Sequence, residues 1–485
     1  MKTSSLFSLI AAAGLVLLTA CTSPPETRRA PMLDVPAARL APISVPGTRT
    51  FGASPEDLAV AGYVEQEYSV SGVANRYAFH DLMQDAAVID GGHAYKTRII
   101  VRRPANAARF NGTVIVEWFN VTLGQDIDFN WATSRGHLMR EGYAYVGVSA
   151  QRVGVERLKT WSAARYGDLA VVAPETTPKD PLQAGDALRW DVSDVLSWDI
   201  FSQTVKALRE PGAVDALPGM KPRRIIATGE SQAGRRLTQY YNAIDPLHRL
   251  VDGMVFYDAG YNTWHLLRGD NPTRLIAVGS EVHSDGRKPV ADGATTRRWE
   301  VAGTSHLSLW DMQVVDAMTT RDQGLKRRDG TPAATVQDLI PGCQHYPLWS
   351  AVPMHKVLNA AFDHVKRWVD GGPPPPAGKA LERGADGAML RHDENGRTFG
   401  GIQLAEYAQP TAFNLGYRNP GPVFCRNGGH HRFYSAAELK AIYPDPEAYV
   451  RRVVETTNAN LAAGYILAVD AAETIKAAQD LFTQR

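Results

Sequence analysis

One short segment limits the possible folds of this chain more than any other. A β-type run at residues 225–228 leads directly into Gly229-Glu230-Ser231-Gln232-Ala233, and a helical pattern follows. The pentapeptide departs from G-x-S-x-G only at its last position, where alanine is still small. Small residues at both ends let a strand turn sharply into a helix, which lifts the central hydroxyl above a sheet. The sequence therefore predicts that Ser231 is a nucleophile at such a turn.

Around this segment, short β-type runs alternate with helical ones. Residues 64–70 and 95–101 alternate like half-buried strands, whereas residues 113–119 and 143–149 are nearly continuous apolar runs typical of buried parallel strands. Further strands are predicted at 224–228, 253–257, 274–278 and 298–301, and helices at 198–208, 232–243 and 356–369. Strands separated by helices build a parallel sheet through right-handed crossovers. We therefore expect an α/β protein with the α/β-hydrolase fold, a mostly parallel sheet flanked by helices, over residues 51–370.

The C-terminal quarter is expected to be an extension packed on this core. The helix at 356–369 is followed by Asp-Gly-Gly and four prolines at 370–376, which end it and form a rigid connector. After short β-like pieces at 400–407, the pattern becomes helical. Residues 371–485 are therefore predicted to contain a Pro-rich connector and helices at 436–442, 448–462 and 471–482.

The N-terminus is typical of an export signal. Lys2 precedes the apolar residues 6–18, a stretch too short to be a permanent membrane span. Residues 18–21, Leu-Thr-Ala-Cys, resemble the bacterial lipobox, in which the cysteine receives a lipid; an ordinary secretory signal is the alternative. We expect residues 1–20 to be a lipoprotein signal peptide and Cys21 to be the lipidation site.

Residues 21–50 are rich in Pro, Ala, Ser and Thr and lack a helical or strand period, so they are predicted to be a flexible tether. Thr22 stands where an aspartate would, by resemblance to enteric sorting rules, retain a lipoprotein at the inner membrane. The expected location is therefore the cell envelope, facing the periplasm or the cell surface. The outer membrane is favoured, with the lipid anchor as the membrane contact.

Charge and cysteine content exclude some classes of function. The 52 basic and 51 acidic residues give a formal net charge of +1, which offers no basis for steering toward nucleic acid. Apart from Cys21, the chain has Cys343 and Cys425, which either form a disulfide in an oxidising compartment or are unrelated buried thiols. Cys425 with His430 and His431 lacks a second ligand pair at structural-zinc spacing, so no metal site is predicted.

A serine nucleophile needs a base and an acid later in the chain. His306 is the predicted base, because it lies in a small-residue loop just after the strand at 298–301; His283 is its rival. The acid should follow an earlier strand, where it orients the imidazole. Glu281 is preferred because a short Gly-Ser turn can direct it back over the sheet, and Asp285 and Asp258 are the alternatives.

Acyl transfer also needs two donors for the developing oxyanion. The N–H of Gln232, the residue after the nucleophile, is one predicted donor. The second should come from the loop after the strand at 113–119, from Asn120 or Val121.

Five motifs together resemble a little-characterised bacterial branch of the α/β-hydrolase superfamily, the alpha/beta hydrolase domain proteins. The resemblance covers roughly residues 55–480, and the motifs are Gly-Glu-Ser-Gln at 229–232, Glu-Trp-Phe-Asn-Val at 117–121, Tyr-Val-Gly-Val-Ser-Ala-Gln at 145–151, Asp-Ile-Phe-Ser-Gln at 199–203 and Val-Ala-Gly-Thr-Ser-His at 301–306. The resemblance implies a cofactor-free serine hydrolase, with Ser231 and His306 carried over by motif.

The function expected from these patterns is hydrolysis of a small-molecule carboxylic ester through an acyl-enzyme on Ser231. Two alternatives stay open at this point: a serine peptidase or amidase, which would use the same residues, and a catalytically inactive binding lipoprotein of the cell envelope. The sequence makes no prediction of oligomeric state.

Overall fold

The computed structural model describes residues 32–81, 83–172, 194–259, 267–327 and 330–483. The predicted signal peptide and Cys21 lie outside these residues. Within the described ranges, no helix is both long and apolar enough to cross a membrane.

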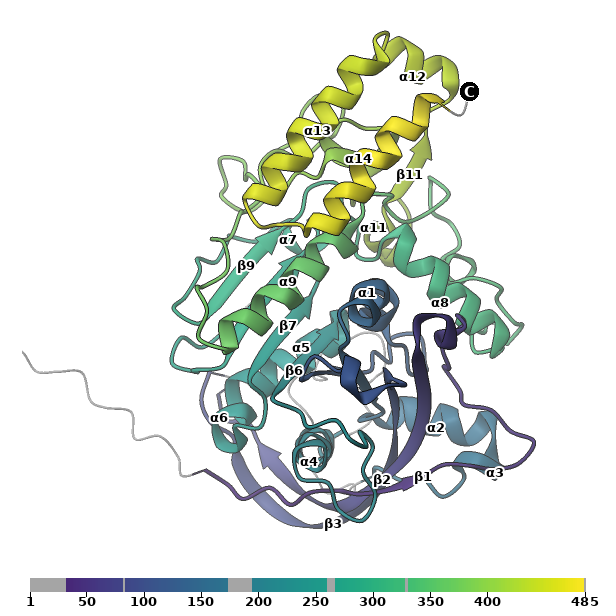
Figure 1. Ribbon diagram of the computed structural model, residues 1–485, viewed down its shortest axis with the longest axis vertical. Coiled ribbons are helices and arrows are strands. Elements are labelled where there is room, and N and C mark those ends of the chain that lie inside the picture. The colour runs from purple at the N-terminus through teal and green to yellow at the C-terminus, as the bar shows by residue number, and fades with distance from the viewer. Residues whose placement is uncertain (1–31, 82, 173–193, 260–266, 328–329, 484–485) are drawn as a thin grey trace, which may run out of the picture. The chain divides into compact units, whose positions relative to one another are not determined.

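A nine-stranded sheet forms the centre of the described part (Figure 1). Its order is β1-β2-β3-β5-β4-β6-β7-β8-β9. The first three strands and the β3–β5 pair are antiparallel, and the six strands from β5 to β9 are parallel. The strands are β1 Arg39–Pro42, β2 Tyr63–Ala78, β3 Ala87–Pro104, β4 Thr113–Trp118, β5 Ala144–Val148, β6 Arg224–Glu230, β7 Gly253–Tyr257, β8 Arg274–Gly279 and β9 Thr296–Glu300. The predicted fold, a mostly parallel sheet with flanking helices, is confirmed.

Helices cover both faces of the parallel strands, which explains why those strands are apolar on both sides. Every residue of β4 is buried, as expected for a central strand between two helical layers. On one face, in front in Figure 1, lie α1 (Phe129–Arg140) and α9 (Met354–Val369), while α5 (Ser231–Gln239) packs on the other. The other helices before α9 are α2 Arg152–Trp161, α3 Ala163–Tyr166, α4 Ser197–Arg209, α6 Asp245–His248, α7 Glu281–Ser284 and α8 Leu309–Arg321, with the short turns η1 Leu58–Ala61, η2 Ala107–Arg109, η3 Tyr240–Ile244 and η5 Val336–Leu339.

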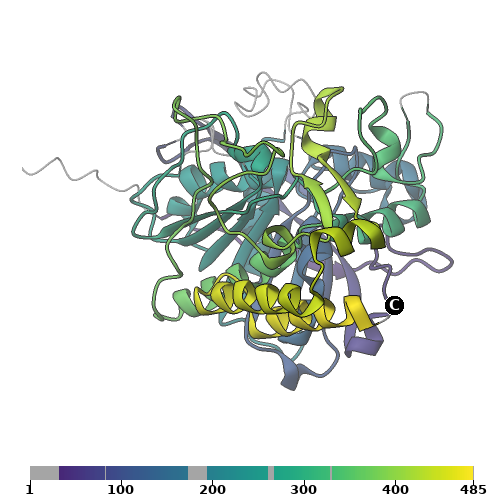
Figure 2. The same cartoon turned by 90° about the horizontal axis from the view of Figure 1, so that it is seen from above.

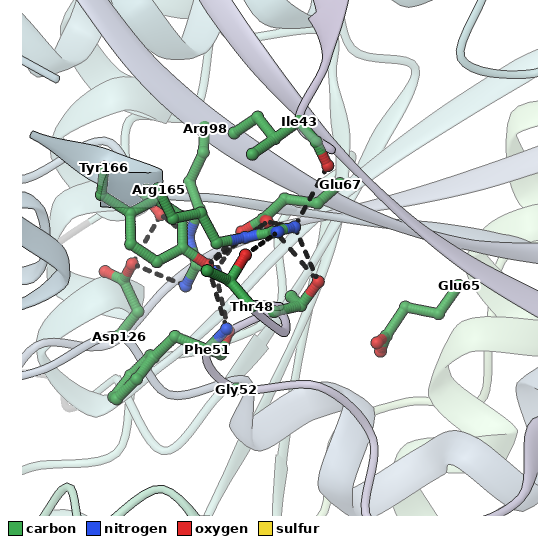
Figure 3. Close-up of polar contacts among 12 residues, drawn as sticks. Ile43, Thr48, Phe51, Gly52, Glu65, Glu67, Arg98, Asp126, Arg165 and Tyr166 are labelled. Carbon is green, nitrogen blue, oxygen red and sulfur yellow. Dashed lines mark hydrogen bonds and ion pairs between the residues drawn. The ribbon is translucent and has the colours of Figure 1, made fainter. Parts of the chain in front are cut away.

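The described part of the predicted tether, residues 32–50, is not free of the core. β1 pairs with β2, and the Arg165 guanidinium donates to Ile43 O at 3.1 Å (Figure 3). The Arg165 side chain is only 6% exposed, and its Nη1 also donates to Thr48 Oγ1 at 3.0 Å. Buried guanidinium groups need acceptors, and this segment supplies some of them through its backbone. The prediction of a flexible tether is therefore wrong for residues 32–50.

The C-terminal segment after α9 packs along the core. It runs beside β9, where Ile402 N donates to Glu300 O at 2.8 Å. The predicted β-like pieces at 400–407 are instead isolated bridges followed by α10 (Ala405–Ala408). The remaining elements are β10 Ala412–Leu415, α11 Val423–Gly428, β11 His430–Phe433, α12 Ala436–Ile442, α13 Pro446–Ala462 and α14 Ala468–Thr483, of which α13 and α14 lie side by side (Figure 2).

Candidate active site

Ser231 lies at the junction where β6 ends and α5 begins. Its φ of 51° is in the left-handed region, which a serine adopts only at an energetic cost and which turns the side chain out of the strand. Gly229 permits this turn, because a Cβ there would lie 2.9 Å from the carbonyl carbon of Ala233. The small residues of the motif thus have the steric role that the sequence suggested.

The structure brings Ser231, His306 and Asp258 together. Ser231 Oγ and His306 Nε2 are 2.7 Å apart, and His306 Nδ1 is hydrogen-bonded to Asp258 Oδ2. The three residues follow β6, β9 and β7, so the carboxyl ends of parallel strands gather them at one edge of the sheet. Asp258 is fully buried, whereas Ser231 and His306 keep 9% and 8% of their surface exposed. A ligand can therefore reach the serine and the imidazole but not the carboxylate.

Asp258 is fixed in place by its neighbours. Ser280 donates to it twice, from N to Oδ1 at 2.7 Å and from Oγ to Oδ2 at 2.8 Å. Burial opposes ionisation of Asp258, but the His283 and His306 imidazoles and the Ser280 N–H lower its pKa below the usual value. The site therefore holds Asp258 as a carboxylate.

The environment of His306 favours the protonated imidazole. Burial alone would lower the pKa of His306, but the nearby carboxyl groups of Glu230 and Asp258 outweigh burial and raise it above the ordinary value. Glu230 Oε1 lies 3.1 Å from Nε2. Burial raises the pKa of Glu230, and the charge of His306 opposes this shift, so the two groups titrate as a coupled pair. Sequence reasoning missed Glu230, although it is the variable residue of the serine motif.

Glu281, the preferred acid in the sequence, lies elsewhere. It opens the short helix α7, and its Oε1 accepts from Gly303 N at 2.6 Å. This contact directs the carboxyl toward the backbone of the loop that carries His306 rather than toward the imidazole. Asp285 points away as well, accepting from Leu390 N at 2.9 Å. The structure thus places the alternative Asp258, and neither of the other two carboxylates, against the imidazole.

His283, the rival base, stacks on His306 with ring centroids 4.6 Å apart. Its contact is with the imidazole face rather than with Ser231. Among the described residues, one group could hold a metal ion by proximity: ligand atoms of Asp258, His283 and His306 lie within 4.8 Å of one another. The carboxylate in this group already accepts hydrogen bonds from Ser280 and His306, which leaves little capacity for a metal.

The predicted oxyanion donors have different surroundings. The N–H of Gln232 lies in the first turn of α5, where no intrahelical acceptor exists. The N–H of Asn120 is already donated to Ile127 O at 3.1 Å, so Asn120 is a poor candidate. The N–H of Val121 has only a long contact of 3.5 Å with Gln232 Oε1. Gln232 and Val121 are therefore the pair that the geometry leaves available.

An apolar pocket adjoins Ser231 and His306. Its apolar lining comes from several loops and helices: Leu123, Phe129, Leu307, Ile340, Trp349 and Phe424. A disulfide between Cys343 and Cys425 joins the segment that contributes Ile340 to helix α11, which contributes Phe424. The two cysteines are 82 residues apart in the sequence, and the bond ties two walls of this pocket together.

A family model described as an alpha/beta hydrolase domain matches residues 29–476, nearly the whole chain. The chain belongs to the alpha/beta hydrolase domain family. The match includes the elbow, the strands that carry Asp258 and His306, and the C-terminal helices of this alpha/beta hydrolase. No match was found among curated proteins.

Solved structures similar to this alpha/beta hydrolase are distant. An alpha-beta serine hydrolase homologue from Coxiella burnetii is 10% identical, with 44% of this chain and 85% of that chain covered and a TM-score of 0.28. A glucuronoyl esterase from Solibacter usitatus is 12% identical, with 51% and 69% covered and a TM-score of 0.27. Likenesses of this strength indicate nothing about substrate.

Proposed function

We propose that this alpha/beta hydrolase is a serine hydrolase that cleaves carboxylic esters through an acyl-enzyme on Ser231. The observation that carries the proposal is the continuous hydrogen-bond chain from the Ser231 hydroxyl through His306 to Asp258, beside an apolar pocket. A serine hydroxyl becomes a nucleophile only when an adjacent base accepts its proton, and this chain supplies that base and its orienting carboxylate.

In the first half of the proposed reaction, His306 Nε2 accepts the Ser231 proton as Oγ attacks the ester carbonyl carbon. Asp258 keeps the other imidazole proton on Nδ1 and stabilises the imidazolium. The N–H groups of Gln232 and Val121 stabilise the negative charge on the carbonyl oxygen. The imidazolium then protonates the alcohol oxygen, the C–O bond breaks, and the acyl group stays on Ser231.

In the second half, a water molecule takes the place of the alcohol. His306 accepts a proton from this water as its oxygen attacks the acyl carbon, and the imidazolium then returns the proton to Ser231 Oγ as the bond between Oγ and the acyl carbon breaks. The products are a carboxylic acid and the free serine. The aromatic and aliphatic lining of the pocket beside Ser231 supports binding of an apolar part of the ester.

A fluorophosphonate probe tests the nucleophile directly, because it modifies activated serines. The wild type should be labelled and Ser231→Ala should not. Ser202→Ala is a matched control: Ser202 also contacts a histidine, His248, at 2.7 Å, but it is fully buried. Equal labelling of wild type and Ser231→Ala would refute the assignment. Rates on p-nitrophenyl butyrate and butyryl p-nitroanilide then separate an esterase from an amidase.

We also propose that the protein is exported and attached to the outer membrane through lipidated Cys21. The N-terminal sequence supports this location, and the Cys343–Cys425 disulfide is consistent with an oxidising compartment. In fractionated cells, Cys21→Ala should move the protein from the membrane to the soluble envelope fraction. An unchanged membrane fraction would contradict the anchor.

A further inference from the structure

A second cavity lies beside His283. Its lining is polar and cationic, unlike that of the apolar pocket. Two arginines, a histidine, a tyrosine and an asparagine contribute to it: His283, Arg287, Tyr417, Arg426 and Asn427, with Val282. None of these lining residues carries a carboxylate. The whole chain has a formal net charge of only +1, so the two arginines of this cavity are a local concentration of positive charge.

Arg426 is the most accessible cation of this cavity. It is an exposed residue of α11, and no hydrogen bond or ion pair joins it to any residue in the described ranges. Arg287 lies on the other side, where its guanidinium donates to His283 O. Carboxyl groups of residues outside the lining adjoin it: Asp258 lies within 4.8 Å of His283, and Asp285, which accepts from Leu390 N, lies near Tyr417. The exposed guanidinium of Arg426 is therefore the positive charge that the cavity offers to a ligand.

The guanidinium of Arg426 is the accessible hydrogen-bond donor of the cavity. Burial lowers the pKa of His283 well below its usual value, although the charge of Asp258 opposes this shift. The Nδ1 of His283 is buried and has no hydrogen-bond partner among the described residues. An arginine fork matches the geometry of a carboxylate.

The cavity is connected to the proposed reaction through α11 and the stacked histidines. Asn427 lines both the apolar pocket and the cationic cavity, and its carbonyl accepts from His306 N at 3.1 Å. His283, which lines the cavity, stacks on the His306 ring. The group nearest to a proton-donating imidazole during acylation is the leaving alcohol. With its acyl part in the apolar pocket, an ester would extend its alcohol part past the imidazole toward the cavity, which shares Asn427 with that pocket.

We propose that the cavity around Arg426 and Arg287 binds a carboxylate on the alcohol part of the substrate, while the apolar pocket holds the acyl part. The preferred substrate class is then an ester between an apolar carboxylic acid and a hydroxy acid. Water cleaves it to the free acid and the hydroxy acid. This inference rests on the proposed esterase function and adds the identity of the leaving group.

Two isosteric esters test this proposal, 3-carboxyphenyl butyrate and its neutral analogue 3-carbamoylphenyl butyrate. The wild type should have a kcat/KM about tenfold higher for the carboxylate ester, since a charge-assisted contact at a solvent-exposed arginine is partly screened. Arg426→Gln should reduce that ratio to about one, and 0.5 M NaCl should reduce it in the wild type.

Arg418→Gln is the matched control, because Arg418 is exposed, stacks over the ring of Tyr417 and does not line the cavity. It should keep the wild-type ratio. A ratio near one in the wild type, a full ratio in Arg426→Gln, or an equal loss in Arg418→Gln would overturn the subsite. Undiminished hydrolysis of both esters by Ser231→Ala would instead overturn the proposed function, so the two failures are distinguishable.

Discussion

Ser202 and His248 make the same contact as Ser231 and His306, with 2.7 Å between the hydroxyl oxygen and a ring nitrogen in each pair. Beyond that contact the two pairs differ. Asp258 touches the His306 ring directly, whereas the hydroxyl of Tyr77 stands between His248 and the carboxylate of Asp199.

The surroundings of the two serines differ as well. Ser231 stands at a left-handed turn and lines a pocket, whereas Ser202 is a fully buried residue of helix α4 that also contacts the hydroxyl of Tyr240 at 2.8 Å. Burial lowers the pKa of His248 to about 4, so this ring stays neutral at physiological pH. A serine next to a histidine is therefore not enough to indicate catalysis; a carboxylate on the ring and access for a ligand distinguish the two pairs.

The largest expected difference between the two serine–histidine pairs is the loss of kcat when the aspartate of each network, Asp258 or Asp199, is replaced by asparagine. Asp258→Asn should lower kcat by about 10³- to 10⁴-fold, because the neutral amide no longer stabilises the imidazolium and its NH2 group can donate to Nδ1, which favours the wrong tautomer. Asp199→Asn should stay within about threefold of wild type, since its partner is a buried structural network. Steady-state rates on p-nitrophenyl butyrate, with thermal melting to confirm folding, give the comparison.

The same assay tests the carboxylates that the sequence favoured. Glu281→Gln and Asp285→Asn should each cost far less than Asp258→Asn, because neither side chain contacts the imidazole. An equal loss in Asp199→Asn and Asp258→Asn would remove the distinction between the two networks.

The second prediction concerns stability against pH. His248 titrates at about 4 in the folded chain and near 6.5 when unfolded, so between these values the unfolded state binds more protons. The neutral His248 ring contributes up to about 3 kcal/mol to the free energy of unfolding above pH 6.5. This contribution is lost as the pH falls toward 4. Urea midpoints at several pH values should therefore fall more steeply for the wild type than for His248→Gln. Parallel slopes would show that His248 does not carry the effect.

The third prediction concerns the serines themselves. Ser202→Ala should destabilise the protein by about 1–3 kcal/mol, because the His248 and Tyr240 groups lose a buried partner. Ser231→Gly should raise stability by about 1 kcal/mol, because glycine adopts a φ of 51° without strain. Chemical denaturation of both variants measures the difference, and a destabilised Ser231→Gly would argue against strain at the elbow.

The smallest expected effect concerns Glu230, which has no counterpart beside His248. Its carboxyl raises the pKa of His306, and the proposed mechanism needs a neutral imidazole in the free enzyme. Glu230→Gln should therefore shift the acid limb of the kcat/KM profile to lower pH. A shift to higher pH would show that Glu230 acts on His306 in another way.

The features that sequence predicted best are those encoded locally. The elbow, the apolar strand β4 and the loop of His306 each depend on a few consecutive residues. The choice between Asp258 and Glu281 was wrong because it depends on side-chain direction. Asp258 turns toward His306 at a φ of 49°, and no residue pattern signals that turn.

Long-range contacts explain the remaining differences. Helix α1 was not predicted because polar residues such as Asn130 are buried in it, where Glu117 accepts their hydrogen bonds. Residues 32–50 lack any period, and Arg165, which is distant in the sequence, holds them through Ile43 O and Thr48 Oγ1 (Figure 3). Patterns of neighbouring residues do not predict such long-range pairings.

Helix α11 has a consequence for how this enzyme could diversify. Its six residues border the apolar pocket through Phe424 and the cationic cavity through Arg426, and Cys425 between them anchors the helix. Ser231, Asp258 and His306 instead follow strands of the central sheet. If the proposed ester subsites are correct, changes in this one short segment would alter the preference for both halves of an ester in a descendant enzyme, while the reacting groups inherited from the ancestor keep their positions.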